Sequence, residues 1–340
     1  MSVALPGAAI VGGWFVCAAT LLGAPALADD DARLWLAAMN EAVGTRNYQG
    51  EFLHLGNGPV EKLRIMHRFK DGRVTERLVS LSHAGREIIR NGSELQCYLP
   101  DEHRVLVESR ADPGTLLGTL PTFGPALESS YRVELAGHAR VIGRNSQIVA
   151  VMPRDGWRFG YRLWIDEETK IPLRTDLCDA DGQMLEQVLF TSLQVGGPLP
   201  DAAFRPDVDA SHFAWERQQG SAARAGAGEL PWLLKLPPGF KLSSSGEERL
   251  PGSEQPVTHL VVSDGLASVS VFIEGPPAPP RQATEGTGRV GSAFAYSKVV
   301  AGHEVTAVGE VPPQTVEFIA SGVAPAKPLK GALGLSLAAH

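Results

Sequence analysis

Several residues of this chain match parts of motifs that carry chemistry, and the first match is a glycine pattern. Residues Gly286–Gly291 (GTGRVG) have the G-x-G-x-x-G spacing with which backbone amides bind a dinucleotide pyrophosphate. That chemistry requires a strand before the glycines and a helix after them. Here a Pro-rich stretch precedes the glycines, and the strand-like Ala293–Tyr296 follows them. We therefore interpret the segment as a glycine-rich loop.

Two metal-binding patterns are also incomplete. Asp179–Gly182 (DADG) resembles half of a calcium loop, but Leu177 and Val188 stand where two of the carboxylate ligands should be. His303 begins an H-E-x-x-H zinc pattern that ends with Ala307 in place of the second histidine. The calcium fragment is interpreted as a turn, and the sequence predicts neither a metal site nor a cofactor.

Nucleophilic and acid–base patterns are missing as well. There is no G-x-S-x-G, and the carboxylates are spread singly rather than in pairs suited to general acid–base catalysis. These absences favour a binding protein over an enzyme, with a hydrolase of unrecognised site as a weaker alternative. Behind a cleaved leader only Cys97 and Cys178 remain; they could form a disulfide in an exported protein or stay as two buried thiols.

The start of the chain predicts export. Residues 1–28 have the form of a signal peptide, with an apolar stretch at Ala8–Leu22 and an A-x-A cleavage site at Ala26–Ala28. The alternative is an uncleaved membrane anchor, but the apolar stretch is shorter than the roughly 20 residues that span a bilayer. The formal charge of −7 argues against nucleic acid as a partner, since phosphate binding needs a basic surface.

The elements that must position any binding site are mainly strands. Asp31–Val43 has the period of a helix, and from Asn47 to Pro100 strand-like runs alternate with turn signals such as Asp71-Gly72. A short helix and a loop are expected near Pro113–Tyr131, then further hairpins. The predicted division is a first domain at 29–205, a linker at 206–229, a smaller second domain at 230–324 and a tail at 325–340.

Apolar side chains at alternate positions of the first hairpins suggest a binding cavity. If helices cover the sheet only in part, an apolar cavity suited to an acyl chain or an apolar peptide remains. The alternative is a core that these side chains fill completely. The candidate lining residues are Phe52, Leu63, Ile65, Leu78, Ile88, Leu106, Leu163 and Trp164.

Segments spread over nearly the whole chain match a known family in order. In the first domain they are Asn47–Phe52 (NYQGEF), Glu76–Leu81 (ERLVSL), Arg86–Gly92 (REIIRNG), Cys97–Pro100 (CYLP), Tyr161–Asp166 (YRLWID) and Pro172–Arg174 (PLR). In the second domain they are Leu236–Phe240 (LPPGF), Ser263–Phe272 (SDGLASVSVF) and Gly302–Pro313 (GHEVTAVGEVPP). Together these segments resemble the MucB/RseB family, the periplasmic negative regulators of the sigma-E (AlgU-type) envelope stress response.

The resemblance implies a mainly β, α+β protein. Its first domain would be a LolA-like unclosed antiparallel β-barrel with covering helices, and its second a smaller α/β domain. Such proteins bind the periplasmic domain of a membrane anti-sigma factor of the RseA/MucA type and protect it from site-1 proteolysis. Lipid or LPS-type ligands are implied to release it, and the family supplies no catalytic residues. We further expect the linker to let the domains reorient, a periplasmic location and a possible homo-oligomer; the competing function is a lipid or lipoprotein carrier.

Overall fold

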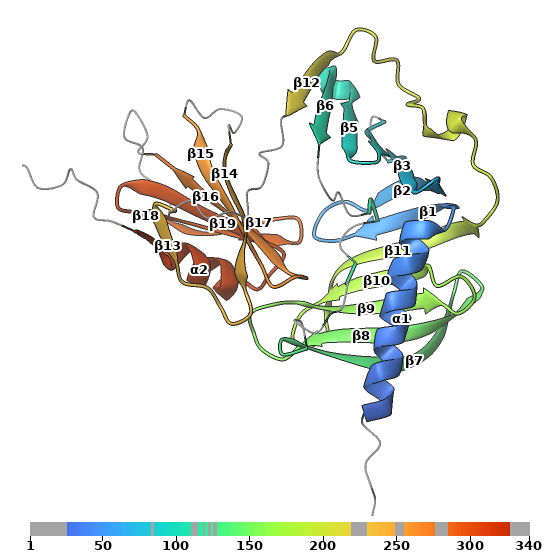
Figure 1. Ribbon diagram of the computed structural model, residues 1–340, viewed down its shortest axis with the longest axis horizontal. Coiled ribbons are helices and arrows are strands. Elements are labelled where there is room, and N and C mark those ends of the chain that lie inside the picture. The colour runs from blue at the N-terminus through green and yellow to red at the C-terminus, as the bar shows by residue number, and fades with distance from the viewer. Residues whose placement is uncertain are drawn as a thin grey trace, which may run out of the picture.

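The first domain is built on one large sheet, and a single long helix lies across it (Figure 1). The computed structural model describes residues 26–82, 85–109, 115–117, 120, 121, 124, 128–218, 230–248, 255–275 and 285–326. The helix is α1 (Ala26–Thr45). The expected helix is thus confirmed, and α1 also includes Ala26–Ala28, the expected cleavage site. Residues 1–25 of the expected signal peptide lie outside the described residues.

Twelve strands form the sheet of the first domain, in the order β12-β6-β5-β4-β3-β2-β1-β11-β10-β9-β8-β7. They are β1 (Tyr48–Leu55), β2 (Glu61–Lys70), β3 (Arg73–Ser80), β4 (Glu87–Asn91), β5 (Glu94–Leu99), β6 (Arg104–Ser109), β7 (Tyr131–Val141), β8 (Arg144–Pro153), β9 (Gly160–Asp166), β10 (Pro172–Cys178), β11 (Met184–Val195) and β12 (Ala214–Gln218). Among the described residues the edge strands β12 and β7 do not pair with each other, so the barrel is unclosed, as predicted.

Local turn chemistry explains why consecutive strands pair. Between β2 and β3 the chain turns at Asp71 and Gly72, whose φ angles are 52° and 74°. Two successive left-handed residues give the type I′ turn, whose twist matches that of the flanking strands. The short helix expected near Pro113–Tyr131 falls mostly on residues outside the described part of the chain, and the described residues 115–117, 120, 121 and 124 are not helical.

The core of the first domain lies between α1 and one face of this sheet. Leu36 and Met39 of α1 are buried together with Ile65, Val149 and Leu163 of the strands. This packing arises because apolar residues recur along one side of the helix at helical spacing. The opposite face of the sheet carries smaller apolar clusters.

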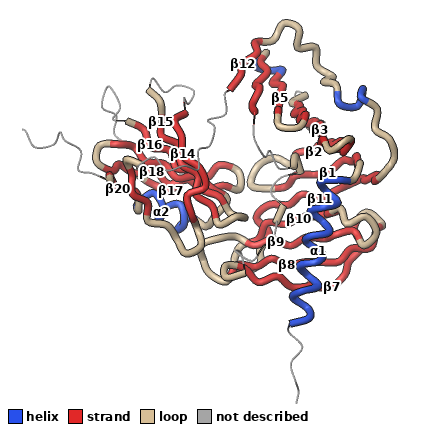
Figure 2. Tube along the Cα trace, in the orientation of Figure 1, coloured by secondary structure: helices blue, strands red, loops and turns tan. Residues whose placement is uncertain are grey.

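The second domain has a six-stranded antiparallel sheet in the order β14-β15-β16-β19-β18-β17, with α2 packed against β18 and β19 (Figure 2). Its elements are β13 (Trp232–Leu234), β14 (Lys241–Glu248), β15 (Val257–Ser263), β16 (Ser268–Glu274), β17 (Gly286–Val290), β18 (Ala293–Val300), β19 (His303–Gly309), α2 (Pro313–Ser321) and β20 (Val323–Pro325). The smaller domain and its final helix match the prediction, whereas the glycine pattern is not a loop, because Gly286–Val290 forms the edge strand β17.

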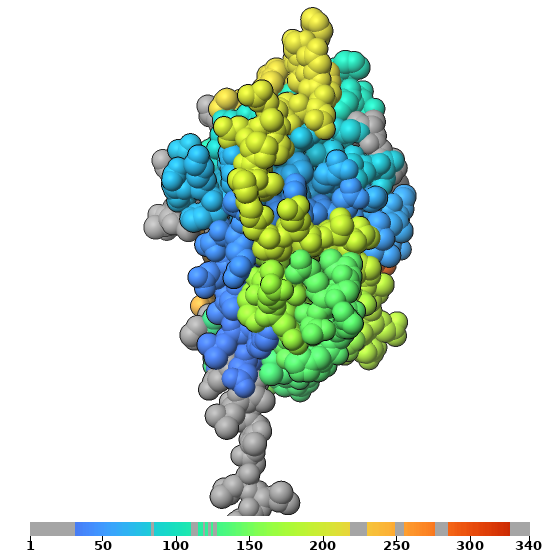
Figure 3. All heavy atoms as spheres, turned by 90° about the vertical axis from the view of Figure 1, so that its right-hand side faces the viewer, coloured from blue at the N-terminus to red at the C-terminus, as the bar shows by residue number. Residues whose placement is uncertain are grey.

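The expected linker starts too early. Within 206–229, residues 214–218 form β12, which pairs in parallel with β6, and Phe213 packs against a cluster on the outer face that includes Tyr98 and Val105. Figure 3 shows this stretch, yellow-green to yellow, as a band over the first domain. Polar and Pro-rich composition concealed a strand that covers the free edge of β6; residues 219–229 lie outside the described part. At the other end, Pro325 belongs to β20 rather than to the tail.

Two further observations concern membranes and metals. No helix among the described residues is long and apolar enough to span a bilayer. In the same part of the chain, no three His, Cys, Asp or Glu side chains come together in a way that could hold a metal ion.

Candidate functional site

A cavity of about 580 Å³ lies against the covered face of the first sheet, over β1–β4 and β11. Its apolar lining comes from these strands, from Pro59, from Leu99 and Pro100 at the end of β5, and from the segment at Leu116 and Leu117. Its polar lining consists of His54, Glu61, Ser80, Arg86, Asp101, Glu102 and Glu186. A volume of this size, lined by both apolar and polar side chains, is within the range of small-molecule sites.

The eight candidate lining residues do not all reach this cavity. Four of them do: Phe52, Leu63, Leu78 and Ile88. Ile65 and Leu163 are fully buried in the core instead. Leu106 lies half-buried on β6, in the same cross-strand row as Ile88 but two strands away.

Trp164 does not line the cavity, contrary to the expectation, and it follows Leu163 directly on β9. Successive strand residues point to opposite faces, so these two cannot both face one cavity. The Trp164 ring lies under the Arg174 guanidinium, 4.1 Å from its carbon to the ring centroid. It belongs to the face of the sheet opposite the one that Leu163 faces.

A row of polar side chains, one from each of the strands β1 to β4, lies at one end of the cavity. The Tyr48 ring stacks on His67 with centroids 4.6 Å apart, and Glu76 lies 3.1 Å from Arg90. Burial lowers the pKa of His67 to about 4, so at pH 7 its ring is neutral and the ion pair of Glu76 is with Arg90. Glu76 also accepts hydrogen bonds from Thr115 Oγ1 and Leu116 N, and so fixes the segment that lines the cavity.

The other end of the cavity reaches the second domain. His54 Nε2 lies 2.5 Å from Glu186 Oε1, and both residues line the cavity. The hydrogen bond with Glu186 raises the pKa of His54. Burial raises the pKa of Glu186, but the hydrogen bond with His54 and the nearby Ser292 hydroxyl of the second domain outweigh it, so the net shift is downward. The Ser292 hydroxyl donates its one hydrogen to Glu310, and burial raises the pKa of Glu310.

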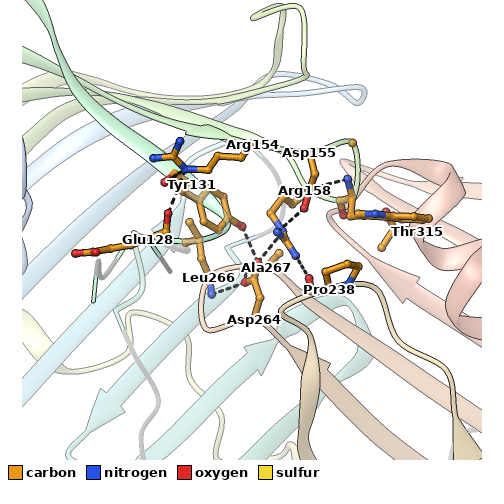
Figure 4. A network of polar contacts seen from close by, with 12 residues as sticks. Glu128, Tyr131, Arg154, Asp155, Arg158, Pro238, Asp264, Leu266, Ala267 and Thr315 are labelled. Atoms are coloured by element: carbon orange, nitrogen blue, oxygen red, sulfur yellow. Dashed lines mark hydrogen bonds and ion pairs between the residues drawn. The ribbon is translucent and has the colours of Figure 1, made fainter. Parts of the chain in front are cut away.

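A buried ion pair fixes the two domains against each other (Figure 4). Arg158 Nε lies 2.9 Å from Asp264 Oδ2, and the two side chains are 0% and 1% exposed. The Tyr131 hydroxyl donates a hydrogen bond to the same carboxylate oxygen at 3.0 Å, and burial raises the pKa of Tyr131 far above its usual value. Arg158 also donates to Asp155 Oδ2 and to the Pro238 carbonyl.

Further contacts extend this interface to α2. Gln314 donates to the Gly156 carbonyl at 2.7 Å and Thr315 to the Trp157 carbonyl at 2.8 Å. The Trp157 ring packs against Phe318 with centroids 5.0 Å apart. The expectation that the linker lets the domains reorient does not fit this arrangement, because reorientation would break a buried ion pair.

The two cysteines are unpaired, and the calcium-like fragment is a turn. Cys97 and Cys178 are free thiols on β5 and β10, with five other strands between them in the sheet, too far apart for the disulfide alternative. Asp179–Gly182 forms the predicted turn, in which Asp179 Oδ1 accepts from the amides of Asp181 and Gln183.

The interdomain ion pair of Arg158 and Asp264 had no signal in the sequence, because the two residues lie in unrelated turns.

Comparison with known proteins assigns both domains. Residues 31–208 match the MucB/RseB N-terminal domain, and residues 227–324 match the MucB/RseB C-terminal domain. The sigma factor AlgU regulatory protein MucB of Pseudomonas aeruginosa is 35% identical, over 90% of this chain and 95% of its own length. The sigma-E factor regulatory protein RseB of Salmonella typhimurium is 30% identical, over 91% and 97%.

A solved structure shows the same fold. The structure of the Pseudomonas aeruginosa MucA/MucB complex matches with a TM-score of 0.69 at 32% identity, covering 87% of this chain and 99% of that one. Both domains take part in these matches, as the resemblance of the short segments had indicated. The chain belongs to the MucB/RseB family.

Proposed function

We propose that this protein is a periplasmic, non-enzymatic regulator that binds the periplasmic domain of a membrane anti-sigma factor of the RseA/MucA type. In this proposal it protects the anti-sigma factor from site-1 proteolysis and so negatively regulates sigma-E-dependent transcription. The observation that carries the proposal is the match, across both domains, to a relative whose structure was solved as a MucA/MucB complex. A lipid or LPS-type ligand in the cavity of the first domain would release the partner.

The position of the cavity supports a link between ligand and partner. Glu186 lines the cavity, and the Ser292 hydroxyl of the second domain lies near enough to lower the pKa of Glu186. A ligand that changes the position or charge of Glu186 therefore acts directly on the domain interface. Such a ligand shifts the equilibrium only by its differential affinity for the released and the complexed forms, and a tenfold difference corresponds to about 1.4 kcal/mol.

The test is a titration of the complex between the mature protein and the periplasmic segment of a MucA-type anti-sigma factor. Lipopolysaccharide and a short-chain phosphatidylethanolamine are added separately, and the affinity is measured by calorimetry. We expect weaker binding as ligand is added, together with faster cleavage of the segment by a site-1 protease. Unchanged affinity at saturating ligand would refute the sensing role, and absence of any complex would refute the regulatory role.

A second candidate, a periplasmic lipid or lipoprotein carrier, is favoured by the cavity in an unclosed barrel. A carrier has no evident use for a second domain that is fixed by a buried ion pair. Pull-down from envelope extract separates the two functions, since a carrier should retain many lipoproteins and a regulator one membrane protein. Homo-oligomer formation remains a prediction, to be checked by light scattering of the purified protein.

A further inference from the structure

We propose that an extended segment of the anti-sigma partner docks on the free edge of β17 in the second domain, where it adds a strand to the six-stranded sheet. This inference rests on the proposed function, because that function supplies the partner. It adds the mode of recognition, which is hydrogen bonding from backbone to backbone, and it places the contact on one strand, Gly286–Val290.

The strand β17 presents unpaired backbone groups along one side. It pairs with β18 on its other side, and among the described residues no strand lies against its free edge. All five of its residues are exposed, and Val290 is 71% exposed. An uncovered row of N–H and C=O groups is a template for pairing with another chain.

The other three edge strands of the two large sheets carry features that discourage such pairing. Within the described part of the chain, β7 and β14 each contain a β-bulge, and β12 has charged residues side by side at Glu216 and Arg217. In contrast, β17 keeps a regular register with β18, and it has no proline and one charged residue, Arg289. The Arg289 guanidinium lies over the Phe294 ring of β18, 5.1 Å from its carbon to the ring centroid. The least protected of the four edges is therefore β17.

The residues of β17 indicate which kind of segment fits. Gly288 lies opposite Ala295 of β18, and a Cβ atom added at Gly288 would meet no other atom within 4 Å. Val290 lies two residues along the strand and so points to the same face. A large side chain of an added strand can therefore lie over Gly288 and Ala295 and pack beside Val290. The segment that fits is extended, with an aromatic or large aliphatic residue opposite Gly288.

The end of β17 lies next to the inner end of the cavity. Ser292, in the turn from β17 to β18, comes two residues after Val290. Its hydroxyl donates a hydrogen bond to Glu310 and lies near enough to Glu186, which lines the cavity, to lower the pKa of Glu186. A ligand that rearranges this contact acts directly on the hairpin that carries the docking edge. A partner on β17 is thus placed where a signal from the cavity would reach it.

The first experiment measures hydrogen exchange of the full mature chain, alone and in complex with the periplasmic segment of a MucA-type anti-sigma factor. Alternate residues of an antiparallel strand direct their N–H groups to opposite neighbours, so about half of the amides of β17 face its free edge. In the complex these amides should exchange roughly tenfold slower, because they become hydrogen-bonded. Exchange in β14, the other edge strand of the same sheet, should not change.

The second experiment measures the affinity of the same segment by calorimetry. Gly288→Lys places a flexible charge beside the added strand and should weaken binding roughly tenfold. Gly288→Ala is the control at the same position, and Ser243→Lys adds the same charge at an exposed position of β14. Both controls should keep the affinity within about threefold of that of the unmodified chain. The melting temperature of each variant should stay unchanged, because the added side chain meets open space.

The outcomes separate the docking edge from the proposed function. A complex that forms without slower exchange in β17, or that Gly288→Lys does not weaken, would overturn the inference and leave the proposed function standing. A dimer in light scattering that Gly288→Lys converts to a monomer would assign the edge to a second copy of this chain, and would overturn the inference as well. Absence of any complex would overturn the proposed function and the inference with it.

Discussion

Replacing Asp264 with Asn should loosen the two domains without unfolding either one. The substitution removes the negative charge that Arg158 and the Tyr131 hydroxyl share, 2.9 and 3.0 Å away. Because both charged side chains are almost completely buried, water cannot replace the lost partner. Breaking such a pair from one side typically costs about 3–5 kcal/mol, since the remaining charge is left buried and uncompensated.

The structure places the expected cost below that range. Asn keeps the Oδ1 acceptor, which now receives the amides of Leu266 and Ala267 at 2.9 and 2.8 Å, so the turn itself is preserved. Arg158 also keeps Asp155 and the Pro238 carbonyl as partners. We therefore expect a loss of about 2–3 kcal/mol in the free energy of domain docking, or roughly a 30- to 150-fold shift toward undocked domains.

Small-angle scattering and hydrogen exchange measure the two consequences. The radius of gyration should rise, and the amides near Trp157 should exchange faster, while amides in the centres of both sheets keep their protection. The control is Glu134→Gln, which breaks the exposed pair with Arg132 and should cost less than about 0.5 kcal/mol. If Asp264→Asn leaves scattering and exchange like those of the control, the buried pair does not hold the domains and the reasoning is wrong.

Three further predictions concern the cavity and the thiols. The hydrogen bond with the Glu186 carboxylate raises the pKa of His54. The stability that this hydrogen bond gives the folded protein is therefore complete below the unfolded pKa of about 6.5 and is lost as pH rises through the folded pKa. The variant His54→Gln should flatten the fall in melting temperature between about pH 6 and 8. Burial raises the pKa of both Cys97 and Cys178, the latter to about 11, so alkylation at pH 8 should be slow in the folded protein and fast in urea. Because the two thiols are free, a reductant should leave the melting temperature unchanged. Ile88→Trp should abolish dodecyl maltoside binding at little cost in stability, whereas Leu163→Ala in the filled core should cost about 2–5 kcal/mol of unfolding free energy.

The parts of the fold that could be predicted are those with local causes. Asp71-Gly72 sets a turn by its own backbone preferences, and the Pro-Pro start of α2 favours a helix from Pro313 onward. Contacts between distant segments have no such signature: Tyr131 and Asp264 are 133 residues apart, and neither residue type announces the other. Leu163 and Trp164 show a second reason why the site could not be predicted fully. Alternation along a strand separates the residues of its two faces, but it does not say which face lines the cavity.

The position of Glu186 bears on how a ligand could release the partner. Separation of the domains would break the Arg158–Asp264 pair together with the interdomain contacts of Gln314, Thr315 and Trp157, and the sum of these contacts exceeds the roughly 1–3 kcal/mol typical of allosteric coupling. A change confined to Glu186, Glu310 and the Ser292 hydroxyl lies within that smaller range, because it involves one hydrogen bond, from Ser292 to Glu310. The sensing step should therefore be a local rearrangement at the inner end of the cavity with the domains still docked. Asp264→Asn should then weaken partner binding even without lipid, whereas Glu186→Gln should leave the docked arrangement intact and reduce the effect of lipid on partner affinity.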